Sequence, residues 1–182
     1  MTAVGVRVLT SGPGTEGAER QLAQDPISGL MTLRRAIEGP DSLPELIVID
    51  TRPDESHAVL NAMVASDEVW AVVETVPAAI ESLPRLLSTT GRIAQQLNNG
   101  LSVTWIVPTR FDRRTRTHNG CLEALRRTYP GRVTQPVPAS VRVVEAHGAR
   151  QPLNVFDPLA APTMAYRVVA EQLGLVARVM NP

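Results

Sequence analysis

The sequence predicts an α/β fold, a three-layer sandwich in which helices cover both faces of a mostly parallel sheet. Short continuous apolar runs, typical of strands buried on both faces, alternate with amphipathic stretches at helical spacing. Of the 182 residues, 43% are hydrophobic but only 3% are aromatic, so Val, Leu, Ile, Ala and Met must build most of the core. This length favours one domain over residues 1–182.

The first elements predicted are a strand, two helices and a second strand. Residues 4–9 alternate apolar and other residues, which predicts a strand suited to a sheet edge. Thr15 and Ser28 are candidate N-caps of two amphipathic helices that end near residues 24 and 37. Residues 46–50 (LIVID) form the clearest strand of the chain, an apolar run that ends in Asp50.

The rest of the chain continues the alternation of strands and helices. The apolar runs predict strands at residues 69–73, 103–107 and 132–137. The amphipathic stretches predict helices at residues 55–65, 81–97, 119–128 and 163–176. Pro84 fits only within the first turn of its helix, where a missing backbone N–H breaks no hydrogen bond.

The charge composition excludes one chemistry and favours one class of partner. All 18 basic residues are Arg, so these residues contain no Walker A lysine, and we do not expect them to hydrolyse ATP or GTP by themselves. The net charge of zero is unevenly distributed, because residues 110–150 hold nine Arg and only three acidic residues. This basic third of the chain suggests an anionic partner.

Other site classes have weaker support. Cys121 is the only cysteine, which excludes an internal disulfide and a cysteine-rich zinc site, and its place in a predicted amphipathic helix argues against a nucleophile. His57, His118 and His147 show no ligand spacing, so we interpret them as surface or structural residues and predict no metal site and no catalytic residue. No apolar run approaches the length of about 20 residues that spans a bilayer, so we expect a soluble, cytoplasmic protein.

A glycine-rich turn offers a competing interpretation. Residues 12–17, from Gly12 to Gly17, match G-x-G-x-x-G between a predicted strand and a predicted helix, as in dinucleotide-binding folds. Pro13 removes a backbone donor, and Asp50 lies well beyond the spacing of about 20 residues expected for a ribose-binding acid. A structural turn is therefore the favoured interpretation, and a nucleotide- or dinucleotide-binding enzyme that uses this loop is an alternative.

Polar side chains follow two of the predicted strands. Asp50 ends one strand at the edge where open α/β folds bind ligands, although a helix-capping role suits it equally well. Residues 112–116 (DRRTR) follow the strand at 103–107, so their guanidinium groups should gather at the same edge. Such a cluster can hold phosphates or a DNA backbone, whereas a solvated loop is the alternative.

Taken in order, several segments resemble one family. Residues 46–53 (LIVIDTRP) look like a Walker B strand with its D-x-P-P ending, and residues 61–69 (NAMVASDEV) resemble the stretch that follows it. Residues 109–115 (TRFDRRT) are similar to a T-x-x-D-x-R-T loop, and residues 137–146 (VPASVRVVEA) to an I-P-x-x-V-R-x-x-E-A segment. Residues 151–167 follow a K-P-h … D-P … A-Y ending, with h apolar. The order of these motifs resembles the ParA branch of the ParA/MinD family of deviant-Walker ATPases.

The resemblance implies a fold like that of P-loop NTPases, but without the Walker A strand and loop. It implies that Asp50 is a remnant of a magnesium site and that Thr109 and Pro138 are remnants of a nucleotide site. No cofactor is expected, unless a partner or a missing segment completes a site for ATP and Mg²⁺. Arg52 stands where the family has a proline. The residues that the resemblance and the basic charge assign to DNA binding are Arg113, Arg114, Arg116 and Arg142.

The function implied is that of a ParA-like partition or segregation protein, or a remnant of one, acting through DNA or partner-protein binding and not through hydrolysis. Non-specific DNA, a homodimer or a ParA-type partner protein is expected, and no membrane. The further alternative is a regulatory module that pairs with a full-length ParA-type ATPase. The family's sheet order also implies that both usual neighbours of residues 46–50 are absent, so we expect this strand to pair with residues 4–9 and 69–73, or with a second chain.

Overall fold

The computed structural model describes residues 2–3, 6–10, 17, 28–39 and 44–175. The contacts of the chain divide it into two compact units, Met1–Ser66 and Asp67–Pro182. The glycine-rich residues 12–16 and most of the helix predicted after Thr15 lie outside the described residues. A single domain over residues 1–182 stays a prediction.

The first unit contains short strands and helices. Strands β1 (Thr2–Ala3) and β2 (Val6–Arg7) pair antiparallel, and the helical elements are η1 (Gly29–Met31), α2 (Thr32–Glu38) and α3 (His57–Ala65). Ser56 is the N-cap of helix α3, and its side chain accepts a hydrogen bond from the backbone N–H of Val59. The buried Asn61 links two of these helices, because its Oδ1 accepts from the backbone N–H of Leu33 at 3.3 Å. The helices predicted at 28–37 and 55–65 are thus confirmed.

The strand predicted at residues 46–50 is absent. This segment lies outside every strand and bridge of the described chain, and Ile47 and Val48 are 43% and 67% exposed. The expected pairing with residues 4–9 is wrong for the described strand there, since β2 pairs with β1. Pairing with residues 69–73 or with a second chain stays a prediction. The physical reason is that an apolar run becomes a strand only when a neighbour pairs its backbone, and no described residue does so here.

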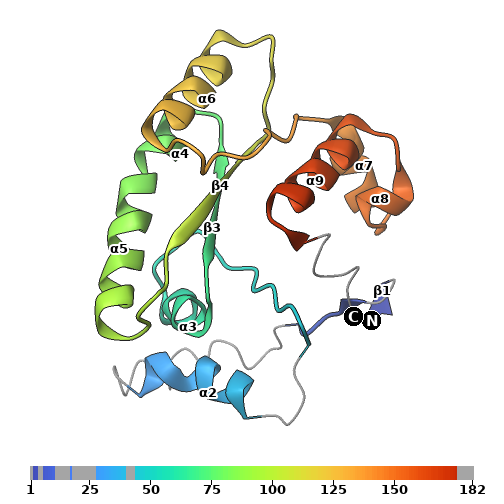
Figure 1. Ribbon diagram of the computed structural model, residues 1–182. Coiled ribbons are helices and arrows are strands. Elements are labelled where there is room, and N and C mark those ends of the chain that lie inside the picture. Colours follow the sequence, from blue (N-terminus) through green and yellow to red (C-terminus); the bar gives the residue numbers. More distant parts are fainter. Residues whose placement is uncertain (1, 4–5, 11–16, 18–27, 40–43, 176–182) are drawn as a thin grey trace. The chain divides into compact units, whose positions relative to one another are not determined.

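The second unit is built on a parallel sheet (Figure 1). Strands β3 (Val69–Glu74) and β4 (Val103–Thr109) pair in parallel, and helices α4 (Pro77–Glu81) and α5 (Leu83–Gln96) connect them. Residues 132–138, which include the strand predicted at 132–137, run parallel to β4 but form only two isolated bridges, Ile106 with Val133 and Phe111 with Pro138. Pro84 lies in the first turn of α5, as predicted.

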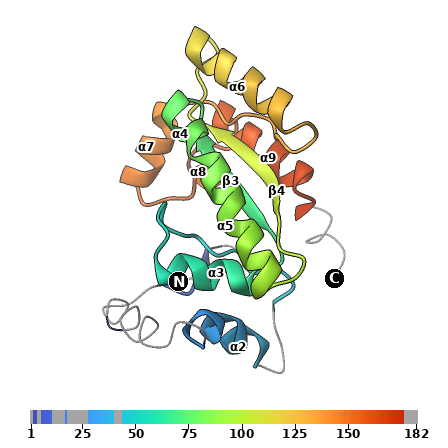
Figure 2. The ribbon, with the colours of Figure 1, turned by 90° about the vertical axis from the view of Figure 1, so that its left-hand side faces the viewer.

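Helices cover both faces of this sheet (Figures 1 and 2). The remaining helices are α6 (Arg116–Thr128), α7 (Val141–Gly148), α8 (Leu153–Phe156) and α9 (Ala161–Gln172). On one face, Ala71 and Ile106 pack with Leu125 of α6 in a buried cluster. On the other face, Val107 packs against Val169 of α9. The predicted α/β class with a parallel sheet is confirmed. In the part of the chain that the structure describes, no helix is both long and apolar enough to cross a membrane.

Candidate functional site

The carboxyl ends of the parallel strands in the second unit bring two of the predicted residues to one edge. Thr109 is the last residue of β4, and its hydroxyl donates to the carbonyl oxygen of Val73 on β3 at 3.4 Å. Pro138 lies on the neighbouring segment, in a parallel bridge with Phe111. Thr109 and Pro138 therefore share the edge where open α/β sheets bind ligands. That they are remnants of a nucleotide site stays a prediction.

One histidine fixes the loop that follows β4. The backbone N–H of Asp112 donates to Nδ1 of His118 at 3.0 Å, and the fully buried hydroxyl of Thr75 lies 3.0 Å from the same nitrogen. Because Nδ1 accepts from a backbone amide, the ring proton sits on Nε2 and the Thr75 hydroxyl is a second donor. His118 thus ties the end of β3 and the loop after β4 to helix α6. These bonds agree with its interpretation as a structural residue.

The same loop holds an ion pair. Arg114 donates from Nε and from a terminal nitrogen to the two carboxylate oxygens of Asp112, both at 3.1 Å, and its backbone N–H donates to Oδ1 at 3.0 Å. The side-chain bonds from Arg114, followed by its backbone bond, lower the pKa of Asp112 to about 2. The side-chain bonds to Asp112, followed by its negative charge, also raise the pKa of Arg114. The carboxylate therefore stays charged and continues to hold Arg114 at neutral pH.

Acidic partners also neutralise two other arginines at this edge. Arg142 donates to Glu145 at 2.9 Å, and its Nε lies 3.3 Å from a carboxylate oxygen of Asp157. Arg110 donates to Glu74 at 3.1 Å, which links the ends of β4 and β3. The basic excess that the sequence predicts for this region is therefore partly compensated in the folded chain.

Two of the predicted arginines remain available. Arg113 lies in the loop after β4 and Arg116 is the first residue of α6; both are exposed, and neither forms an ion pair with another described residue. Arg113 and Arg116 follow the end of β4, and Arg142 follows the neighbouring segment that runs parallel to it. That these residues bind DNA stays a prediction.

Asp50 belongs to the first unit and is exposed, in the segment that forms no strand. A magnesium site needs several oxygen ligands, and a nucleotide site of the P-loop type needs a phosphate-binding lysine. The chain contains no lysine, and the Thr109 hydroxyl already donates to a carbonyl. Nor do three or more acidic, His or Cys side chains gather as metal ligands within the described ranges. By themselves, these residues do not fit ATP and magnesium.

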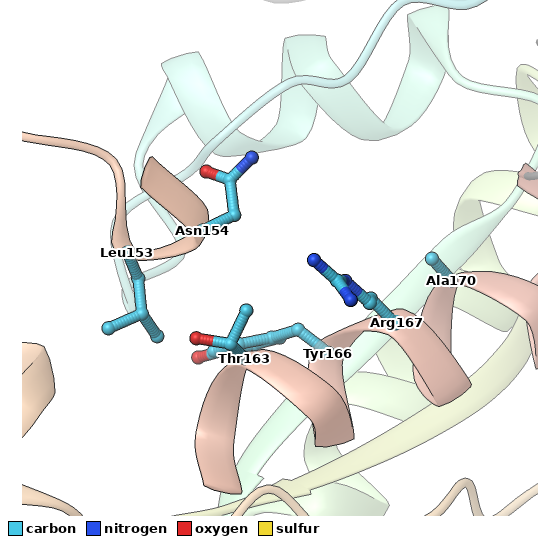
Figure 3. A pocket seen from close by; sticks show the side chains of 6 residues that line it. All are labelled: Leu153, Asn154, Thr163, Tyr166, Arg167 and Ala170. Atoms are coloured by element: carbon cyan, nitrogen blue, oxygen red, sulfur yellow. The ribbon is translucent and has the colours of Figure 1, made fainter. Parts of the chain in front are cut away.

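A separate hollow of about 340 Å³ lies between α8 and α9. Figure 3 shows the guanidinium of Arg167 reaching into it from α9 and the amide of Asn154 from α8. The other lining residues are Leu153, Thr163, Tyr166 and Ala170. None of the residues that the sequence predicts as site residues lines this hollow, which is open to solvent.

The comparisons with known proteins agree with this architecture. A family model described as an AAA domain matches residues 3–103. The chain is 30% identical over 158 residues to the sporulation initiation inhibitor protein Soj of Bacillus subtilis, a match that covers 86% of this chain and 62% of Soj. It is 28% identical over 178 residues to the chromosome partitioning protein ParA of Caulobacter vibrioides, a match that covers 93% of this chain and 64% of that protein. The chain thus spans less than two thirds of the length of these relatives.

The solved structure of a Cyanothece McdA–ATP complex superimposes with a TM-score of 0.75 at 19% identity, over 88% of this chain and 63% of McdA. The parallel sheet, its helices and this superposition define the class as an α/β protein with the fold of P-loop ATPases. The family model and the relatives narrow it further. The chain belongs to the ParA/MinD family of partition ATPases.

Proposed function

We propose that this chain is a ParA-like partition protein of the cytoplasm that acts by binding DNA through the edge of its second unit, and not by hydrolysing ATP. Its similarity to the chromosome partitioning protein ParA and to Soj supports the partition role. The observation that carries the DNA-binding part is the pair of exposed arginines, Arg113 and Arg116, without a carboxylate partner among the described residues. Guanidinium groups bind phosphate oxygens through parallel hydrogen bonds.

The ion pairs rank the four predicted arginines. Arg113 and Arg116 have no competing acid, so a phosphate can bind them without displacing a partner. Arg114 is held by Asp112 through two side-chain bonds, and Arg142 by Glu145 and Asp157. The N-terminus of the 13-residue helix α6 adds a partial positive charge beside Arg116. Arg113 and Arg116 should therefore contribute most, and Arg114 and Arg142 less.

Fluorescence anisotropy with a labelled random-sequence duplex tests this proposal. We expect non-specific binding with a dissociation constant of about 10⁻⁴ to 10⁻⁶ M at physiological salt. Arg113→Ala combined with Arg116→Ala should weaken binding and reduce the slope of log affinity against log salt by about 1.8, which is about 0.9 for each lost phosphate contact.

A matched control uses the other end of the same helix. Arg126 and Arg127 are exposed in the last turn of α6, roughly 15 Å from Arg116 at 1.5 Å per residue. Replacing both with Ala removes the same charge and should change the salt slope less. Equal losses in the two double variants would reject the proposed edge. No binding at low salt would reject DNA as the partner and would favour the regulatory module that pairs with a ParA-type ATPase.

The proposal also includes the absence of hydrolysis by these 182 residues. No described side chain supplies the phosphate-binding lysine, and Asp50 lies exposed in a segment without strand structure. Phosphate release from ATP with Mg²⁺ should therefore equal the buffer blank. Turnover that Asp50→Ala abolishes would contradict this expectation, whereas turnover that the variant leaves unchanged would indicate a contaminating ATPase.

A further inference from the structure

The hollow of about 340 Å³ between α8 and α9 is formed by side chains of the second unit alone. Its lining residues all lie between Leu153 and Ala170. Hydrogen bonds fix the connection between the two helices. The backbone N–H of Asp157 donates to the carbonyl oxygen of Leu153 at 2.9 Å, and the buried Thr163 hydroxyl donates to the carbonyl oxygen of Asp157 at 2.7 Å. The hollow is therefore preformed, as binding sites usually are.

The charged side chain in this hollow lacks an acidic partner. Arg167 forms no ion pair with another described residue, although Glu171 lies about one turn further along α9. Instead, a terminal nitrogen of its guanidinium donates to the sulfur of Met164 at 3.7 Å. Figure 3 shows the guanidinium facing the hollow. A thioether is a weak acceptor and a guanidinium has five N–H donors, so Arg167 keeps donors for a stronger acceptor.

The other lining groups define what such an acceptor must be attached to. The side-chain amide of Asn154 reaches into the hollow from α8 and forms no hydrogen bond inside the described ranges. Leu153, Ala170 and the ring of Tyr166 add apolar surface. A carboxylate has two oxygens that match the guanidinium fork and lone pairs left for an amide N–H. The hollow therefore suits a carboxylate carried on an apolar body.

The surroundings of the hollow indicate a large ligand. Pockets for small molecules bury most of the ligand surface, whereas this hollow is open to solvent. Apolar side chains beside it are exposed: Met164 and Tyr166 are each 45% exposed, and Leu159, between the two helices, is 82% exposed. Tyr, Met and Arg are enriched at protein–protein interfaces, and exposed apolar patches mark such sites. A protein partner explains these features better than a free organic acid.

We propose that the hollow between α8 and α9 binds an acidic peptide segment of a partner protein. A Glu side chain of the partner binds Arg167 and Asn154, and its apolar neighbours pack on Tyr166 and Leu153. This interaction goes beyond the proposed function and does not rest on DNA binding, because none of the four arginines predicted to bind DNA lines the hollow.

An NMR titration of the full chain with the peptide N-acetyl-Leu-Glu-Leu-amide tests the site. The side-chain N–H signals of Arg167 and Asn154 should shift and saturate, with a dissociation constant in the millimolar range. The same peptide with Gln in place of Glu should bind at least about tenfold more weakly, because the bonds to a charged acceptor are lost. Arg167→Gln should reduce the affinity for the Glu peptide by a similar factor.

Matched variants separate this site from the rest of the surface. Arg127→Gln removes the same charge from the exposed last turn of α6 and should leave the peptide affinity unchanged. Arg113→Ala combined with Arg116→Ala should also leave it unchanged, whereas Arg167→Gln should not alter the affinity for duplex DNA. The peptide site and the DNA-binding edge can thus fail independently. Circular dichroism checks that each variant folds.

Three results would overturn the proposal. In the first, the Glu peptide shifts neither the Arg167 nor the Asn154 signal. In the second, the Glu and Gln peptides bind with equal affinity, which would show that the carboxylate is not recognised. In the third, acetate binds as tightly as the Glu peptide, which would show an anion site that gains nothing from the apolar neighbours of a peptide.

Discussion

Two segments with similar apolar sequences adopt different structures in the two units. Residues 69–74 (VWAVVE) form β3, paired with β4 and buried at Ala71 and Val73. Residues 46–50 (LIVID) form no strand, and Ile47 and Val48 are largely exposed. Composition therefore does not decide which run becomes a strand. The deciding difference is whether a neighbouring strand is present to pair the backbone.

The largest expected effect is a difference in the free energy of unfolding between matched Ile→Ala substitutions, one in the paired sheet and one in residues 46–50. Ile106→Ala in β4 should lower the free energy of unfolding by about 2–5 kcal/mol, because Ile106 is 1% exposed and its loss leaves a cavity. Ile47→Ala should change it by less than about 0.5 kcal/mol, as for other surface substitutions. Urea unfolding followed by far-UV circular dichroism reports on both units, since both contain helices. An equal loss in Ile47→Ala would show that residues 46–50 are packed in solution.

The sequence predicted the elements whose causes are local. Residues 103–107 are continuous and apolar, and they form β4 beside a strand that follows the same pattern. Residues 46–50 carry the same signal, but pairing depends on segments distant in sequence, so the prediction failed. Helix α7 was not predicted, although Ser140 was available as its cap and accepts from the backbone of Arg142. Three valines within α7 obscured that signal, because β-branched residues favour strands.

The site shows the same division between local and distant causes. The position of Arg113, Arg114 and Arg116 directly after β4 could be predicted, because the strand and the polar run are adjacent in sequence. The ion pair between Arg142 and Asp157 and the contact of His118 with Thr75 join residues 15 and 43 positions apart. No spacing rule predicts such contacts. Only the folded structure therefore shows that acidic side chains partly neutralise the arginines at this edge.

A second comparison concerns the histidines of the two units. His118→Ala should lower stability by about 1–3 kcal/mol, because it leaves the buried Thr75 hydroxyl and the N–H of Asp112 without their acceptor. His57→Ala in the first unit should cost less, since His57 offers only its backbone carbonyl to Asn61 and its side chain forms no hydrogen bond with another described residue. Thermal unfolding measures both. Thr75→Val removes the hydroxyl but leaves the bond from Asp112 to His118, so its loss of stability should lie between the losses in His57→Ala and His118→Ala. A loss larger than that of His118→Ala would contradict this order.

The smallest expected effect is on the pKa of a carboxyl group. Each unit contains an aspartate that accepts hydrogen bonds from the residue two positions later in the sequence. Hydrogen bonds from the side chain and backbone of Ser56 lower the pKa of Asp54, whereas those from Arg114 lower the pKa of Asp112 from 3.8 to about 2. Since the pKa of Asp112 is lower in the folded chain, its contribution to stability is present above pH 3.8 and is lost as the pH falls towards 2.

Arg114→Ala should raise the pKa of Asp112 only part of the way to its ordinary value, because the backbone N–H of residue 114 still donates to Oδ1. Arg113→Ala removes the same charge from the adjacent position without breaking a bond to Asp112, so it should shift that pKa much less. Carbon-detected NMR titration of the Asp112 carboxyl group distinguishes the two. A similar rise in both variants would mean that the general positive charge of the loop lowers the pKa, and not the two side-chain bonds. In that case Arg114 would be as free to bind a phosphate as Arg113, and the ranking of the arginines at this edge would have to be revised.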